Sequence, residues 1–385
     1  MASFPPPVVD SIDWSNVGFK VREVNGHVES TFSATTGKWS PLKFVKDPYM
    51  RIHGMAPALN YGQQAYEGLK AFRGPGDTTV RVFRPNKNAD RMQLSASAVS
   101  MPAVPQQMFI DAVMAAVALN AEFVPPHATG AAMYIRPQLY GSSAQLALQP
   151  PDEYTFAVFV MPTGVYHGVH PVKCLILDDF DRAAPFGVGH AKVGGNYAPV
   201  LRHSDKARNQ GYGITLHLDS ATHSEVDEFS TSGFIGAKVD GESVTLVVPD
   251  SSAVIDSVTS DSVQEIGRSL GWTVEKRAIS YSEVPEFNEV MAAGTAAALV
   301  PIRSITRRIH TGSDKSVASK GLKNVSVPRE NEEEIVFLDE SITDAGPICL
   351  QLLRLLQGIQ LGKVEDTFGW VQVVKAEDGD KVSKE

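Results

Sequence analysis

Hydrophobic and polar residues alternate along four short stretches of the chain, with the period typical of half-buried β-strands. These stretches are residues 79–83, 131–140, 153–161 and 172–177. The pairs Asn25-Gly26 and Asp240-Gly241 lie between further alternating runs, and both are strong turn signals. We therefore expect hairpins over residues 21–33 and 238–248.

Apolar residues recur at helical spacing elsewhere in the chain. This pattern predicts helices over residues 87–97, 107–124, 261–270 and 348–360. In the second of these helices, Ile110, Val113 and Val117 would face the core. Strands and helices that follow one another in this way predict an α/β (α+β) fold, and 385 residues suffice for two domains.

A break in the pattern divides the chain into two regions. Pro162-Thr163-Gly164 ends the first strand-rich region, and a second one opens soon afterwards. We therefore expect a smaller N-terminal α/β domain over 1–165, an interdomain linker over 166–180 and a larger C-terminal domain over 181–385. Residues 303–334 are polar and charged, which predicts an exposed excursion.

Composition and charge narrow the class of protein. Hydrophobic residues make up 43% of the chain, which is enough for a large core. A net charge of −9 without a long basic stripe argues against nucleic acid or a membrane as partner. With two cysteines, the chain can form neither a disulfide framework nor a cysteine-rich metal site. The acidic residues 178–181 are interpreted as a solvated strand end, so no metal is expected.

The sequence also indicates the cellular compartment of the protein. The chain shows no secretory signal and no run of ~20 apolar residues that could span a bilayer, so we expect a cytoplasmic protein. The basic residues Lys20 and Arg22 leave a mitochondrial location open.

Residues 187–199 place Lys192 between two pairs of glycines. Glycine allows other groups to approach the backbone closely, so a lysine in this setting can be kept from water. Desolvation favours the neutral amine, which attacks carbonyl carbons and forms Schiff bases. The alternative interpretation is a glycine-rich surface turn that carries a solvated lysine.

The sequence Ala-Lys-Val-Gly-Gly-Asn-Tyr at 191–197 resembles the cofactor-lysine motif of the branched-chain amino-acid aminotransferases, which are fold-type IV pyridoxal-phosphate enzymes. The preceding Asp-Arg-Ala-Ala-Pro at 181–185 is similar to that family as well. Further motifs occur in the family's order between about residues 45 and 302. The resemblance implies a two-domain fold-type IV architecture, with pyridoxal 5′-phosphate bonded to the catalytic Lys192 in the larger domain.

Three segments resemble the part of this family that binds the cofactor phosphate. Arg91 ends a stretch like the family's phosphate-arginine segment, and its planar guanidinium suits phosphate. The alternative is an arginine on a solvated helix surface, with Asp90 as its nearest acid in sequence. The other two segments are a turn that contains Thr295 and a predicted helix start, whose N-terminus favours an anion. The resemblance implies that the phosphate is bound by Arg91, Val258, Thr259 and Thr295.

This helix start departs from the family pattern in two places. Ser257-Val258-Thr259 stands where the family usually has Gly-Ile-Thr, and Ser260 stands where it has arginine. The threonine is kept. Taken alone, these residues are also typical of a plain helix cap, which serine and threonine favour.

The resemblance also implies partners for the cofactor ring. Glu228 matches the family's glutamate, whose negative charge favours the protonated ring nitrogen. Gly233 replaces the asparagine that the family has five residues later. Tyr197 resembles the tyrosine whose hydroxyl meets the phenolic oxygen of the cofactor. The alternative for this acidic stretch is a surface loop, which we expect for the neighbouring Glu225. The alternative for Tyr197 is core packing.

Residues of the substrate side resemble the family as well. Tyr134-Ile135-Arg136-Pro137 resembles the substrate-side strand, and Arg136 is the candidate for binding the second carboxylate of glutamate or 2-oxoglutarate. The resemblance implies a substrate site formed by Tyr61, Tyr66, Tyr134, Arg136, Tyr166, Ala296 and Ala297. In the family, the equivalent of Tyr61 comes from a partner subunit. For each tyrosine alone, ordinary core packing is the alternative.

Together, these features predict a pyridoxal-phosphate-dependent aminotransferase. The resemblance implies a homodimer that converts Leu, Ile or Val and 2-oxoglutarate into a branched 2-oxo acid and glutamate, as in branched-chain amino acid biosynthesis. Other fold-type IV enzymes stay open as alternatives, namely a D-amino-acid or (R)-amine aminotransferase and an aminodeoxychorismate lyase. A non-catalytic phosphate- or nucleotide-binding protein that uses the glycine-rich loop stays open too.

Overall fold

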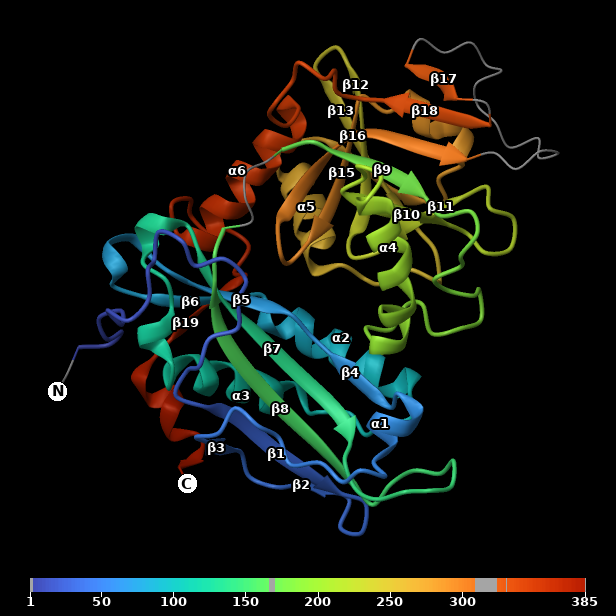
Figure 1. Cartoon of the computed structure of the whole chain (residues 1–385). Helices are drawn as coiled ribbons and strands as arrows, with labels where there is room; N and C mark the ends of the chain where they lie inside the picture. Colours follow the sequence, from blue (N-terminus) through green and yellow to red (C-terminus); the bar gives the residue numbers. More distant parts are fainter. Residues whose placement is uncertain (1–2, 166–169, 309–323, 330, 385) are drawn as a thin grey trace. The chain divides into compact units, whose positions relative to one another are not determined.

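The computed structural model describes residues 3–165, 170–308, 324–329 and 331–384 (Figure 1). The described chain forms two compact units, and each contains one ten-stranded sheet. The first unit consists of Met1–Tyr166, Ala191–Gly194 and Gln357–Glu385, and the second of His167–His190 and Gly195–Leu356. Helices and sheets in both units confirm the predicted α/β (α+β) class.

The sheet of the first unit is mainly antiparallel. Its strand order is β19-β6-β5-β7-β8-β1-β3-β20, with β2 paired to β1 and β4 paired to β7. In chain order the strands are β1 (His27–Ser33), β2 (Lys38–Trp39), β3 (Lys43–Val45), β4 (Gln64–Tyr66), β5 (Leu69–Arg73), β6 (Val80–Phe83), β7 (Ala132–Gly141), β8 (Glu153–Thr163), β19 (Val371–Val374) and β20 (Ser383–Lys384).

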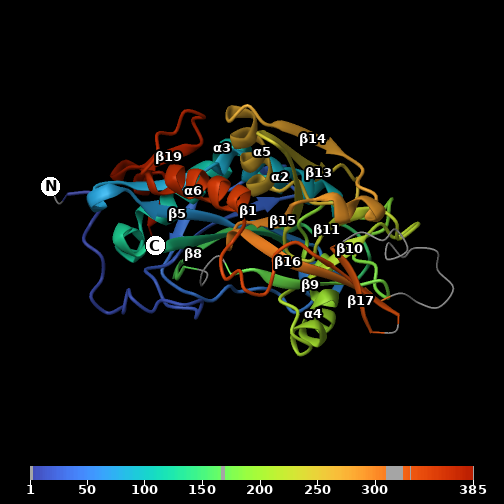
Figure 2. The ribbon, with the colours of Figure 1, turned by 90° about the horizontal axis from the view of Figure 1, so that it is seen from above.

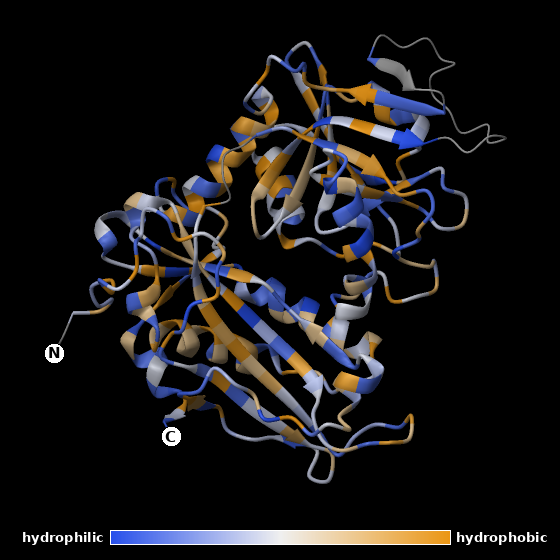
Figure 3. Ribbon diagram, in the orientation of Figure 1, coloured by the Kyte–Doolittle hydropathy of each residue, from blue (hydrophilic) through white to orange (hydrophobic). Residues whose placement is uncertain are grey.

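Two helices, α2 (Pro85–Ala98) and α3 (Gln106–Ala118), share a hydrophobic core with one face of this sheet. Met133, Ile135 and Leu139 of β7 are fully buried in that core. The alternate residues of β7, Tyr134 and Arg136, are only partly buried and lie on the other face, which we call the open face. Figure 3 shows how consistently hydrophobic the neighbouring strand β8 is. The open face is thus the side of the sheet on which polar side chains can meet a ligand.

The sheet of the second unit is mixed. Its strand order is β11-β10-β9-β16-β15-β12-β13-β14, and β18 pairs with both β16 and β17. Its strands are β9 (Val172–Ile176), β10 (Ile214–Leu218), β11 (Val226–Phe229), β12 (Gly233–Asp240), β13 (Ser243–Pro249), β14 (Thr273–Arg277), β15 (Glu289–Gly294), β16 (Ala298–Arg308), β17 (Val325–Arg329) and β18 (Glu332–Val336). The predicted hairpin over 238–248 is confirmed, since Asp240 pairs with Ser243.

Helices complete the two units. The first unit also contains the short α1 (Pro57–Tyr61). In the second unit, α4 (Leu201–Arg208) contacts β10, and α5 (Val258–Ser269) packs against β12, β14 and β15 (Figure 2). The last helix, α6 (Pro347–Leu361), begins where the buried carboxylate of Glu289 accepts hydrogen bonds from the N–H groups of Ile348 and Cys349 at 2.9 and 3.0 Å. A carboxylate at this position satisfies N–H groups that have no partner within the helix.

The division of the chain differs from the predicted domains 1–165 and 181–385. Residues 357–385 belong to the first unit because β19 pairs with β6 and β20 pairs with β3. The segment Ala191–Gly194, which carries Lys192, also belongs to the first unit. These pairings join residues that are far apart in sequence, so the local pattern gives no sign of them.

Two local predictions are wrong. Residues 21–24 form no strand, because Asn25 bonds through its N–H to Asn120 Oδ1 at 2.8 Å and β1 pairs with β2, β3 and β8 instead. The described ends of the excursion predicted over 303–334 are strands of the sheet, and Arg307 and Glu333 are buried. Residues 309–323 lie outside the described part of the chain.

Within the described ranges, no single helix combines the length and apolar character that a membrane span requires. Only the bent combination of α3 with residues 121–129 meets this criterion, and α3 is packed into the core.

Candidate active site

Lys192 is fixed by its backbone within the first unit. Its N–H donates to Ser95 Oγ of α2 at 2.9 Å, and its carbonyl accepts the N–H of Tyr66 at 3.1 Å. The neighbours Ala191 and Val193 are buried in the core of the unit. A Cβ on Gly194 would lie 2.0 Å from Gln64 Nε2, so a larger residue there would displace that amide. The segment around Lys192 is therefore packed into the unit and is not a free surface turn.

The side chain of Lys192 lies over an aromatic ring. Its Nζ is 5.0 Å from the ring centroid of Tyr66, and Arg136 Cζ is 4.9 Å from the same centroid. Two cations therefore share one π-system, an arrangement that a negatively charged ligand between them would stabilise. The structure thus brings together three of the predicted residues, one catalytic and two for the substrate.

Tyr134 continues this group along the open face. Arg136 Nη2 donates to Tyr134 Oη at 3.0 Å, and its guanidinium also lies over the Tyr134 ring, with Cζ 5.0 Å from the centroid. Lys70 of β5 is paired with Tyr134 across the strands, so the two side chains share a face. Burial lowers the pKa of Lys70 to about 8. This second amine is a feature that the motifs do not indicate.

Arg91 is buried and bound by a carboxylate. Its Nε and Nη2 each donate to Glu67 at 2.7 Å, and Asn88 Nδ2 donates to the same carboxylate at 2.7 Å. Arg91 is 8% exposed and Glu67 is fully buried, so the alternative of a solvated surface arginine beside Asp90 does not hold. A bidentate pair of this kind fixes the guanidinium plane. Glu67 lies outside the predicted site residues, although it is only one residue from Tyr66.

In the second unit, Glu228 is a buried carboxylate at the end of β11 and is 4% exposed. It accepts hydrogen bonds from Arg182 Nη2 and, at 3.2 Å, from the N–H of Ile255. Arg182 also donates to the carbonyl groups of Gly189 and Ala253 at 3.2 and 3.1 Å. Glu225, by contrast, is exposed, as expected. Arg182 was not among the predicted site residues, and the only signal for it was its place in the Asp-Arg-Ala-Ala-Pro motif.

The start of α5 and the turn after β15 are neighbours in the second unit. Ser257 is the N-cap of α5, since its Oγ accepts the N–H of Ser260 at 3.2 Å. The same hydroxyl donates to the carbonyl of Ala293 at 3.4 Å, one residue before Gly294 ends β15. Two of the three predicted phosphate segments are therefore in contact. The residues predicted to bind the phosphate there are Val258, Thr259 and Thr295, and the adjoining Ala296 and Ala297 are predicted for the substrate.

The three departures from the family pattern also lie together in this unit. A Cβ on Gly233 would lie 3.4 Å from Ser257 Cβ and 3.7 Å from Ser260 Cβ, which is ordinary van der Waals contact. A methyl group at 233 would therefore fit, and the three positions form one local group at the start of α5.

Three predicted residues are not joined to these groups by the contacts described. Tyr61 is half exposed on α1, and its hydroxyl donates to the carbonyl of Leu146. Tyr197 lies partly buried in the second unit, immediately before a short 3₁₀ helix at Ala198–Val200. Tyr166 lies outside the described residues.

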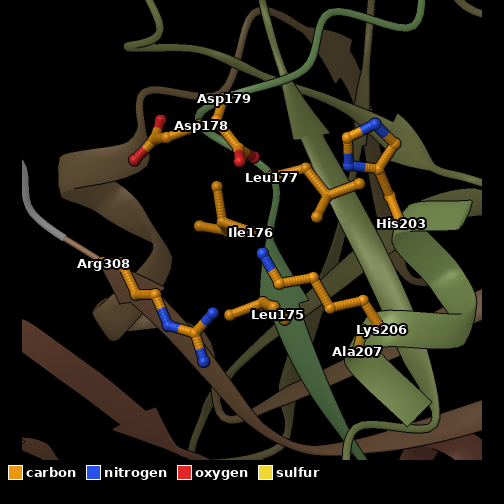
Figure 4. A pocket seen from close by; sticks show the side chains of 9 residues that line it. All are labelled: Leu175, Ile176, Leu177, Asp178, Asp179, His203, Lys206, Ala207 and Arg308. Atoms are coloured by element: carbon orange, nitrogen blue, oxygen red, sulfur yellow. The ribbon is translucent and has the colours of Figure 1, made fainter. Parts of the chain in front are cut away.

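Each unit contains a cavity. One of about 350 Å³ in the first unit is lined by Tyr134 and Arg136 among others. The other, of about 70 Å³, lies in the second unit between β9, α4 and Arg308, and none of the predicted site residues lines it (Figure 4). Asp178 at its edge is bound by Arg307, with Nε 2.7 Å from Oδ2 and Nη2 2.9 Å from Oδ1. No cluster of metal-ligating side chains is found among the residues described.

Comparison with known proteins gives the family. Residues 64–305 match the family model described as amino-transferase class IV. The chain is 50% identical over 368 residues to Aminotransferase poxL of Penicillium oxalicum, which covers 95% of this chain and 94% of that protein. It is 47% identical over 378 residues to the branched-chain amino acid aminotransferase gloG of Glarea lozoyensis, with coverage of 97% and 98%.

A solved structure shares the fold. The branched-chain amino acid aminotransferase of Escherichia coli superimposes with a TM-score of 0.70 at 22% identity, over 92% of this chain and 100% of that chain. This likeness confirms the predicted fold-type IV architecture. The relatives are named aminotransferases and transaminases, which sets aside a non-catalytic binding protein. The chain therefore belongs to the class IV aminotransferases, enzymes that use pyridoxal 5′-phosphate.

Proposed function

We propose that this aminotransferase transfers the amino group of a branched-chain L-amino acid (Leu, Ile or Val) to 2-oxoglutarate. The observation that carries the proposal is the Tyr66 ring, with Lys192 Nζ 5.0 Å and Arg136 Cζ 4.9 Å from its centroid. A primary amine for the chemistry and a guanidinium for a carboxylate thus flank one aromatic wall. The open face beside them borders an apolar cavity, which suits an aliphatic side chain.

Within each unit, the chemistry of the residues present suits part of the cofactor. We assign its aldehyde carbon to Lys192 Nζ, its phosphate to Arg91, Val258, Thr259 and Thr295, its ring nitrogen to Glu228 and its phenolic oxygen to Tyr197. The donor chemistry supports this assignment, since Arg182 holds the buried Glu228 and a helix N-terminus adjoins the threonine-bearing turn. When bound, the cofactor supplies an electron-withdrawing ring that weakens the substrate Cα–H bond.

Lys192 then acts as the general acid and base. Its Nζ would hold the cofactor in the resting enzyme and, once free of it, would carry the proton that leaves substrate Cα. The Tyr66 ring keeps this amine beside the substrate, and the hydrogen bonds of the Lys192 backbone limit how far it can move. Arg136 binds the second carboxylate of 2-oxoglutarate or glutamate in the return half-reaction, as Tyr134 holds its guanidinium in place.

The direct test is a half-reaction of the holoenzyme without an acceptor. L-Leucine should bleach the visible absorption of the bound cofactor and release its 2-oxo acid in a 1:1 ratio to enzyme sites. Bleaching by D-alanine or an (R)-amine, with no response to L-leucine, would favour the other fold-type IV transaminases. The ratio of oxo acid to sites separates transamination from slow decomposition of the cofactor.

We further propose a homodimer, supported by an apolar surface on the first unit. Leu146 and Leu148 are 75% and 84% exposed, and Met55, Leu59 and Tyr61 nearby are at least two-fifths exposed. The Tyr61 hydroxyl donates to Leu146 O, and the N–H of Gln145 donates to Met55 O, so these residues belong to one surface. Exposed apolar groups gathered in this way are typical of protein–protein interfaces.

Replacing Leu148 with glutamate should dissociate the dimer and reduce turnover at least ~10-fold, because it places a charge in an apolar interface. Light scattering coupled to gel filtration would give the mass of each species. Leu201→Glu is the matched control, since Leu201 is 65% exposed on α4 of the second unit and should leave mass and turnover unchanged. A monomeric wild-type protein with full activity would contradict the proposal.

A further inference from the structure

The cavity of about 350 Å³ lies entirely within the first unit. Its floor is the open face of the sheet, with Tyr134 and Arg136 from β7 and Phe159 and Met161 from β8. These residues lie opposite one another in the antiparallel register, Tyr134 with Met161 and Arg136 with Phe159. The N-terminal segment that runs into β1 covers this floor and contributes Val21, Arg22, Glu23, Val24 and Gly26 (Figure 1).

The cavity shares Arg136 with the group formed by Lys192, Tyr66 and Arg136. Arg136, which lines it, is the same residue whose Cζ lies 4.9 Å from the Tyr66 ring, and Lys192 Nζ lies 5.0 Å from that ring. A substrate whose Cα is beside the amine therefore has the cavity within reach of its side chain. Asn25 anchors the covering segment through hydrogen bonds to Asn120 Oδ1, Leu119 O and Glu122 Oε1.

The cavity has room for more than a branched aliphatic side chain. An apolar cavity of roughly 150 Å³ already accommodates a benzene ring, and this one has more than twice that volume. A four-carbon isobutyl group would leave much of it empty or filled with water. Val24, Phe159 and Met161 give the interior apolar walls, while Glu23 and Asp47 are exposed at the rim.

We propose that the site is not limited to branched-chain donors and takes L-amino acids with side chains of six or more carbons, linear or ending in an aryl ring, with a higher kcat/KM than leucine. The inference rests on the proposed transamination and names the class of side chain that its site takes. The apolar stem would lie along Phe159 and Met161 of the floor, and the end would lie beneath Val24 of the covering segment. Each methylene buried in an apolar pocket improves binding by about 0.8 kcal/mol, which corresponds to roughly fourfold.

A donor series on the wild-type holoenzyme tests this proposal. Leucine, norleucine, 2-aminooctanoate and homophenylalanine would be compared by the rate at which each bleaches the cofactor without an acceptor. We expect kcat/KM to rise by about fourfold per added methylene from norleucine to 2-aminooctanoate. The kcat/KM of homophenylalanine should exceed that of leucine at least ~10-fold. A series in which leucine has the highest kcat/KM overturns the inference and leaves transamination intact. If no L-amino acid bleaches the cofactor, the proposed function itself fails.

A variant that fills the cavity tests whether this cavity determines the preference between donors. Val24→Trp should lower the ratio of kcat/KM for homophenylalanine to that for leucine at least ~10-fold, because the indole takes up space beneath the covering segment. Val373→Trp is the matched control, since Val373 is 47% exposed on β19 of the same unit and does not line the cavity. An unchanged ratio in a folded Val24→Trp protein, shown by its circular dichroism, would overturn the assignment of this cavity.

Discussion

Replacement of Lys192 with alanine should abolish amino transfer, with a loss of at least ~10³-fold in the first half-reaction. The amine serves both as the covalent attachment for the cofactor and as the base at substrate Cα, and no other group can replace it in both roles. Lys70 shares the open face but is held in β5, paired with Tyr134. Single-turnover formation of the 2-oxo acid would measure the loss.

The control for this variant is Lys206→Ala, which removes an exposed lysine from α4 and should leave the rate unchanged. Cofactor content should be measured in both proteins, because Lys192→Ala can still bind the cofactor through its phosphate. Turnover of Lys192→Ala at the wild-type rate would show that another amine does the chemistry, with Lys70 as the first candidate.

Replacement of Glu228 with glutamine should lower kcat on the order of 100-fold. The substitution removes the negative charge that favours a protonated cofactor ring, and it leaves the guanidinium of Arg182 buried without its anion. Breaking a buried ion pair from one side costs about 3–5 kcal/mol, so the variant should also unfold at a lower urea concentration. Steady-state rates and urea titrations would report the two effects separately.

Glu225→Gln is the matched control for the charge, because Glu225 lies three residues before Glu228 and is exposed. It should change neither the rate nor the urea midpoint. A Glu228→Gln protein that loses stability but keeps its kcat would show that the Arg182–Glu228 pair supports the fold only. The absorption maximum of the bound cofactor distinguishes these outcomes, since it responds to the protonation of the ring.

Periodicity predicted most elements close to their final bounds. The strand expected over 131–140 is β7 at Ala132–Gly141, and the helix expected over 87–97 is α2 at Pro85–Ala98. These elements have one face in a core, so burial and sequence period coincide. The helix expected over 107–124 ends at Ala118 because a short 3₁₀ turn follows. Hairpins depend on partner choice as well, which explains why the pattern over 21–33 was misleading.

The motifs name candidate site residues, but they do not indicate the contacts that hold them. Glu67 binds Arg91 from 24 positions away, and Arg182 reaches Glu228 from 46 positions away. Such pairs depend on which strands become neighbours, and that information is absent from local periodicity. The cavity above Phe159 and Met161 could not be predicted either, because its cover is an irregular segment with no repeating pattern.

The proximity of Gly233 to Ser257 and Ser260 has a consequence for mutagenesis at these three positions. Residues in van der Waals contact rarely make additive contributions to activity or stability. Introducing asparagine at 233 alone would set an amide against two hydroxyl groups, one of which already caps α5. The effect of a substitution at any one of these positions will therefore depend on the residues at the other two, and the three positions have to be varied together.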